Sequence, residues 1–112
     1  MEKIYNKLVR DNIPDIIKKD NCIPYTRVLS DEEYKLELER KLYEEYKEVL
    51  EAKESSDRVE ELADMLEIII SLARLENKSI DDVLEVAKCK RVKRGGFDKK
   101  IFLEKVVSND SQ

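Results

Sequence analysis

Glycine and proline are missing from the whole middle of the chain. Both prolines lie at or before Pro24 and both glycines at or after Gly95, so residues 25–94 contain neither of the two residues that most disfavour a helix interior. Charged residues make up 43% of the chain and hydrophobic residues 41%, a mixture that suits amphipathic helices better than a sheet. A length of 112 residues fits one domain. The sequence therefore predicts a single all-α domain over residues 1–112.

Local signals predict three main helices, over residues 32–53, 57–76 and 79–94. The first follows Ser30-Asp31-Glu32-Glu33, which has the spacing of a capping box. The third ends at Gly95, as helices often do. Residues 25–29 and 101–107 are rich in residues that favour strands, and they are candidates for one short β pairing.

The second half of the helix predicted over 57–76 is apolar nearly all round, through Ile68-Ile69-Ile70. A helix with that profile is buried on most faces. Because a chain of this length has few elements to cover it, we expect oligomerisation, as a dimer or tetramer, to complete the bundle. A non-catalytic helical oligomerisation or regulatory module would explain this helix equally well, without any chemistry.

The composition of the chain limits where the protein is located in the cell and which catalytic residues it can use. The N-terminal residues show no signal peptide, and the longest apolar run is far too short to cross a membrane, so we expect a cytoplasmic protein without a membrane partner. The net charge of -4 argues against a general nucleic-acid-binding protein. The chain has no His, which excludes Ser-His-Asp and Cys-His catalysis and His metal ligands.

Acidic residues recur at helical spacing on two neighbouring predicted helices. Glu45 and Glu48 share one face of the first, and Glu61 and Asp64 share one face of the second. If the helices run antiparallel through the turn near Ser55, all four carboxylates lie at a similar level, at about 1.5 Å rise per residue. Like charges that close repel unless cations neutralise them, and an all-oxygen cluster suits Mg²⁺ or Mn²⁺. The alternative is a pair of solvated, charge-rich helices held by salt bridges.

A basic stretch near the C-terminus stands out in an otherwise acidic chain. Its members are Lys88, Lys90, Arg91, Lys93, Arg94, Lys99 and Lys100. Phosphate is their natural counter-charge, since Arg donates to it in pairs. The alternative is cations placed favourably at a helix C-terminus.

Several stretches together resemble the MazG-like nucleotide pyrophosphohydrolases, members of the all-α NTP pyrophosphatase superfamily that includes phosphoribosyl-ATP pyrophosphohydrolase. The principal one is Glu44-Glu45-x-x-Glu48 followed by Glu61-x-x-Asp64. The others are Leu62-Ala63-Asp64-Met65-Leu66-Glu67, Tyr5-Asn6-Lys7-Leu8-Val9-Arg10-Asp11-Asn12-Ile13-Pro14 and Lys90-Arg91-x-x-Arg94-Gly95-Gly96-Phe97. One departure is Asn12, where one branch of the family often has Lys.

The resemblance implies a helical bundle assembled as dimers or tetramers. It also implies Mg²⁺-dependent cleavage between the α- and β-phosphates of a nucleoside triphosphate, giving a monophosphate and pyrophosphate. Carried over onto this chain, it assigns the metal to Glu45, Glu48, Glu61 and Asp64, and catalysis to Glu44 and Glu45. It assigns the substrate phosphates to Lys90, Arg91 and Arg94, with Lys7 and Arg10 as further candidates. Which nucleotide is the substrate stays open, and phosphoribosyl-ATP is one alternative.

Overall fold

The computed structural model describes residues 1–109 and is all-α. Its helices are α1 (Ile13–Lys19), α2 (Asp31–Glu51), α3 (Ser55–Leu75) and α4 (Ile80–Arg94). The all-α prediction is therefore confirmed, with main helices close to the predicted bounds. The chain divides into two compact units, Met1–Ile80 and Asp81–Gln112. Whether they act as the single domain expected from the length stays a prediction.

The predicted β pairing is wrong. Residues 25–29 and 101–107 adopt no strand, and neither does any other part of residues 1–109. Val28 and Phe102 are 97% and 86% exposed, so neither segment packs its apolar side chains against a neighbour. Strand-favouring residues describe a chain that fits a half-buried sheet surface, and no such surface meets these segments.

The start of α2 is fixed by the predicted capping box. The Ser30 side chain accepts a hydrogen bond from the Glu33 amide at 3.2 Å, and the Ser30 amide donates to Glu33 Oε1 at 3.3 Å. Arg27 adds a two-pronged ion pair to the same carboxylate, at 3.0 and 3.3 Å. The helix therefore begins at Asp31, and the capping box satisfies the free amides of Ser30 and Glu33.

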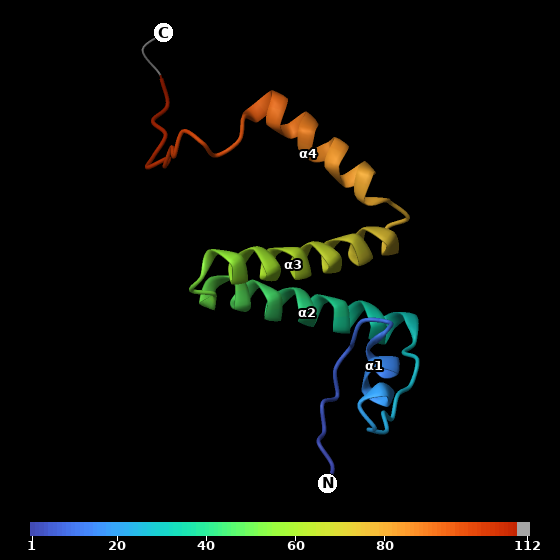
Figure 1. Ribbon diagram of the computed structural model, residues 1–112. Coiled ribbons are helices and arrows are strands. Elements are labelled where there is room, and N and C mark those ends of the chain that lie inside the picture. Colours follow the sequence, from blue (N-terminus) through green and yellow to red (C-terminus); the bar gives the residue numbers. More distant parts are fainter. Residues whose placement is uncertain (110–112) are drawn as a thin grey trace. The chain divides into compact units, whose positions relative to one another are not determined.

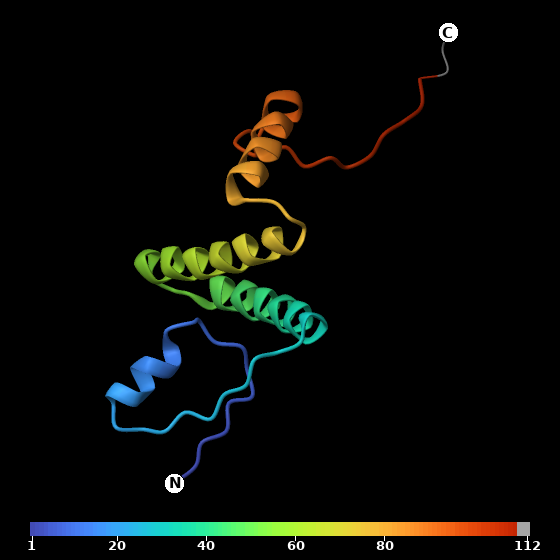
Figure 2. The ribbon, with the colours of Figure 1, turned by 90° about the vertical axis from the view of Figure 1, so that its right-hand side faces the viewer.

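Helices α2 and α3 lie side by side and antiparallel in both views (Figures 1 and 2), and they form the centre of the first unit. The buried apolar residues of the described chain are Leu38 and Val49 on α2 and Ala73 on α3. A second apolar stripe of α3, formed by Val59, Leu62 and Leu66, is exposed. Within the first unit, α2 therefore covers only one face of α3.

The second unit consists of α4 and the segment that follows it. Gly95 has φ 84°, a left-handed conformation that favours glycine, and its amide donates to the Arg91 carbonyl at 2.8 Å. This ends α4 where the sequence predicts. No residue of α4 is buried.

None of the helices within residues 1–109 has the length and apolar character of a membrane span.

Candidate metal centre

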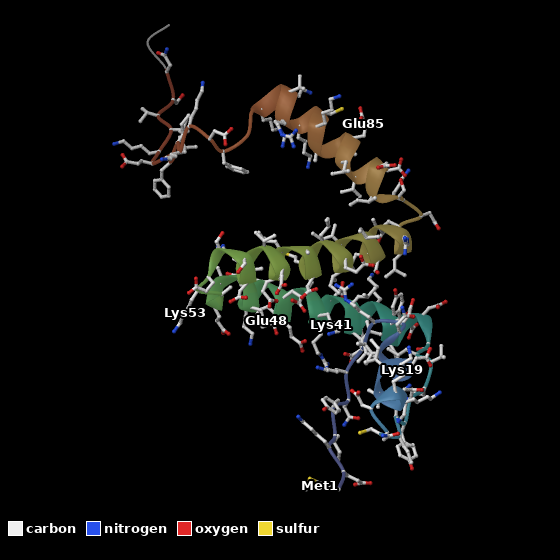
Figure 3. The ribbon with its side chains drawn as sticks, in the orientation of Figure 1. Met1, Lys19, Lys41, Glu48, Lys53 and Glu85 are labelled. Carbon is white, nitrogen blue, oxygen red and sulfur yellow. The ribbon has the colours of Figure 1, made fainter. Side chains whose placement is uncertain are left out.

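Three carboxylates converge between α2 and α3. Glu45 on α2 and Glu61 and Asp64 on α3 each offer one oxygen, and these oxygens all lie within 4.8 Å of one another. The structure thus brings together three of the four predicted metal ligands. The fourth predicted ligand, Glu48, is not one of these three residues. It lies on α2, and Figure 3 labels it between Lys41 and Lys53.

The convergence follows from the hairpin. A short connection joins the end of α2 at Glu51 to the start of α3 at Ser55. Because the helices run antiparallel, residues at similar distances from this connection face one another at about the same level. Glu61 and Asp64 also share a face of α3, at i and i+3.

The cluster leaves two carboxylate oxygens without partners. The Oε2 atoms of Glu45 and Glu61 are buried, and neither has a hydrogen-bond partner within residues 1–109. Both side chains are only half-buried as a whole. A buried, unpaired carboxylate oxygen is unfavourable, so these two atoms lack the kind of counter-charge that a cation provides.

The crowding of these acids shifts the pKa values of two of them. The adjoining Glu48 carboxyl, with which a proton can be shared, and burial raise the pKa of Glu61 to about 7. Burial, with repulsion from Glu48, raises the pKa of Glu45. Although exposed, Glu48 thus belongs to the same cluster, because it acts on both residues. We call these four residues, Glu45, Glu48, Glu61 and Asp64, the acidic cluster.

One cation of the chain already reaches the cluster. Arg10 Nη2 donates to Asp64 Oδ1 at 2.7 Å, across 54 positions of sequence. The family resemblance makes Arg10 a phosphate-binding candidate, and no sequence pattern predicts its pairing with Asp64. An Arg in a loop gives no periodic signal, so only the three-dimensional path of the N-terminal segment reveals this contact.

The other predicted residues of the first unit lie outside this arrangement. Glu44 is half-buried and is not part of the converging group. The Lys7 ammonium lies 5.4 Å from the Tyr5 ring centroid, and Lys3 lies 5.2 Å from the same centroid. Lys7 therefore makes a local cation–π contact.

The predicted phosphate-binding residues of α4 belong to the second unit. Lys90 and Arg94 line a hollow of about 310 Å³ along this helix, together with Glu85, Val86, Cys89 and Lys93. Arg91, Lys93 and Arg94 occupy the last turn of α4, where cations also complement the helix dipole. Both interpretations of the basic stretch, phosphate binding and dipole compensation, fit this placement.

The donor set of the acidic cluster fits a hard divalent cation. It consists of carboxylate oxygens, the ligands that Mg²⁺ and Mn²⁺ prefer, and two of those oxygens are buried without a partner. The Asp64 carboxylate already attracts one cation, the Arg10 guanidinium.

Comparisons of the chain with protein-family models, with curated proteins and with solved structures give no significant match. The MazG-like family therefore remains a resemblance of the sequence motifs.

Proposed function

We propose that the chain is a Mg²⁺-dependent nucleotide pyrophosphohydrolase, acting in the cytoplasm, that cleaves between the α- and β-phosphates of a nucleoside triphosphate. The observation that carries the proposal is the convergence of Glu45, Glu61 and Asp64, with two buried oxygens left unpaired. Arg10 pairs with Asp64, but no such partner meets the buried oxygens of Glu45 and Glu61 within residues 1–109. Carboxylates this close repel one another, which disfavours the arrangement unless a further cation is bound for part of the working cycle. The motif resemblance supports the choice of reaction.

Each residue has a role in this proposal. Glu45, Glu48, Glu61 and Asp64 hold the cation, which is Mg²⁺ or Mn²⁺. A divalent cation bound there would neutralise phosphate oxygens and stabilise the charge that develops during hydrolysis. Water supplies the incoming oxygen, the bridging oxygen leaves with pyrophosphate, and a carboxylate takes the water proton. Glu44 and Glu45 are the candidates for that carboxylate. The resemblance assigns phosphate binding to Lys90, Arg91 and Arg94, which belong to the second unit.

Pyrophosphate release tests the proposal directly. The substrates are the nucleoside and deoxynucleoside triphosphates and phosphoribosyl-ATP, each with and without Mg²⁺. We expect release from at least one of them, dependent on Mg²⁺, and lost in Asp64→Asn and Glu48→Ala. Glu39→Gln, which changes an exposed acid elsewhere on α2, is the matched control and should keep full activity. If no substrate releases pyrophosphate, or if Asp64→Asn keeps full activity, the chain is not this enzyme.

A second candidate function is a non-catalytic oligomerisation or regulatory module. The exposed stripe of Val59, Leu62 and Leu66 favours it, because an uncovered apolar helix face marks an interaction surface. We propose a second copy of the chain as the partner, giving a dimer or tetramer. This module predicts that Glu61→Gln and Asp64→Asn leave self-association intact, and that no substrate is hydrolysed. The enzyme proposal shares the self-association but requires the acids.

A further inference from the structure

The acidic cluster holds a cation supplied by the chain itself, the Arg10 guanidinium. Its distance of 2.7 Å to Asp64 is that of a short, charge-assisted hydrogen bond. The two side chains remain 59% and 43% exposed, so water reaches both partners. An ion pair this accessible contributes modestly to stability and exchanges readily for another cation.

The backbone around Arg10 explains why this side chain is delivered to α3. The Arg10 carbonyl accepts a hydrogen bond from the Ile13 amide at 3.1 Å, in the turn that opens α1. Leu8 and Val9, directly before it, are partly buried and anchor the segment. The guanidinium therefore extends from a fixed turn, and its contact with Asp64 joins residues near the N-terminus to α3.

Charge makes this contact relevant to a metal ion. A divalent cation drawn to the meeting point of Glu45, Glu61 and Asp64 would share the Asp64 carboxylate with the guanidinium. Two positive groups at one carboxylate repel each other, and each weakens the binding of the other. Arg10 has further N–H donors, and its exposure leaves them accessible to an anion such as phosphate.

We propose that Arg10 and a divalent cation compete for Asp64, so that docking of the N-terminal segment regulates cation affinity at the acidic cluster. This inference rests on the proposed function for the identity of the site, and it adds a regulation that the motifs do not contain. Arg10 acts on the cation only through the Asp64 carboxylate that the two share. A cation that enters the acidic cluster weakens the docking of the N-terminal segment. Removal of the guanidinium raises the affinity of the cluster for the cation.

Titration with Mn²⁺ in the absence of nucleotide tests the competition. Isothermal calorimetry on the full chain compares the wild type with Arg10→Gln, Arg10→Lys and Arg27→Gln. The last is the matched control, because Arg27 is also an exposed arginine in an ion pair, to Glu33 at the start of α2. We expect Arg10→Gln to bind Mn²⁺ about 5- to 10-fold more tightly than the wild type. Arg10→Lys, which keeps the charge, and Arg27→Gln should stay close to the wild type.

Weaker or unchanged Mn²⁺ binding in Arg10→Gln overturns the proposal, since weaker binding would mean that Arg10 orients Asp64 for the metal. A reciprocal measurement on the wild type needs no variant. Saturating Mn²⁺ should speed hydrogen exchange of the α1 amides, and unchanged or slower exchange contradicts the competition.

Failure of this inference is distinguishable from failure of the proposed function. If Arg10→Gln tightens Mn²⁺ binding but no substrate releases pyrophosphate, the competition stands and the enzyme does not. If no form of the chain binds Mn²⁺, both are overturned.

Discussion

Glu33 serves two structures at once, the capping box of α2 and the ion pair with Arg27. Hydrogen bonds from Arg27 and Ser30 lower the pKa of Glu33 to about 2. The unfolded chain, with a pKa near the ordinary value of about 4.3, therefore takes up a proton first as the pH falls. The ionised Glu33 carboxylate therefore stabilises the fold fully above about pH 4.3, and this stabilisation is lost between about pH 4.3 and pH 2.

Glu33→Gln should consequently flatten the acid limb of the stability profile. Urea unfolding at about pH 6 and about pH 3 measures this, and the midpoint should fall less in Glu33→Gln than in the wild type. Glu32→Gln, which changes an exposed acid of the same helical turn, is the control and should fall as the wild type does. Equal losses in all three proteins would contradict a stabilising role of the Glu33 carboxylate.

Glu61 has the opposite electrostatic position, because the folded state disfavours its charge. With its pKa raised to about 7, ionisation destabilises the fold as the pH rises from about 4.3 through 7. Without divalent cations at mildly alkaline pH, Glu61→Gln should therefore melt at a higher temperature than the wild type. With Mg²⁺ present the order should reverse, because the variant has lost a ligand.

Differential scanning fluorimetry with and without Mg²⁺ tests the Glu61 prediction, and Glu60→Gln on the same helix is the control. The control should keep the full Mg²⁺-induced rise in melting temperature, whereas Glu61→Gln should lose at least half of it. A Glu61→Gln variant that is less stable than the wild type without metal would show that the carboxylate has a structural partner.

At the scale of elements, the sequence predicts the main helices to within two residues at each end. It does so because the signals are local: the Ser30 capping box and the stop at Gly95 are both observed. The β pairing failed because a strand depends on a partner distant in sequence, which residue preferences do not specify. The start of α3 is less clearly marked in the sequence, because its N-cap residue, Glu54, makes no side-chain capping hydrogen bond.

The α2–α3 hairpin depends on a very small core. Leu38 is the most buried apolar side chain, at 2% exposure, and Leu36 on the same helix is 64% exposed. We expect Leu38→Ala to destabilise the chain by about 2–4 kcal/mol and Leu36→Ala by less than about 1 kcal/mol. Urea unfolding followed by circular dichroism compares the two. Similar losses in both variants would mean that a partner covers Leu36.

At the scale of the whole molecule, the acidic cluster was predictable and its counter-charge was not. Glu45, Glu48, Glu61 and Asp64 lie at helical spacing on two helices joined by a short turn, so sequence distance alone sets their common level. Arg10 reaches Asp64 from a segment without periodicity, 54 positions away. The path of such a segment depends on tertiary packing, which no local pattern encodes.

The exposed stripe of α3 leads to the last prediction, which concerns assembly. Val59, Leu62 and Leu66 recur at helical spacing, the pattern of an inward-facing stripe, yet they are 61%, 47% and 46% exposed. Apolar burial contributes about 25 cal/mol per Å², so leaving a whole helical stripe in water forfeits a large stabilisation in a chain with so small a core. A second copy that packs on this stripe recovers it.

Leu66→Glu should therefore break the assembly, because each interface would bury an unpaired carboxylate. Val28→Glu introduces the same charge at a side chain that is 97% exposed, outside the helices, and is the matched control. Sedimentation velocity should report an oligomer for the wild type and Val28→Glu, and a shift towards monomer for Leu66→Glu. Circular dichroism measures whether Leu66→Glu keeps its helices when it no longer assembles. If the monomer lacks a sufficient core of its own, the helices should be lost together with the assembly. If Leu66→Glu still forms the oligomer, the interface does not include this stripe. If the wild type is a monomer, the proposed self-association is wrong.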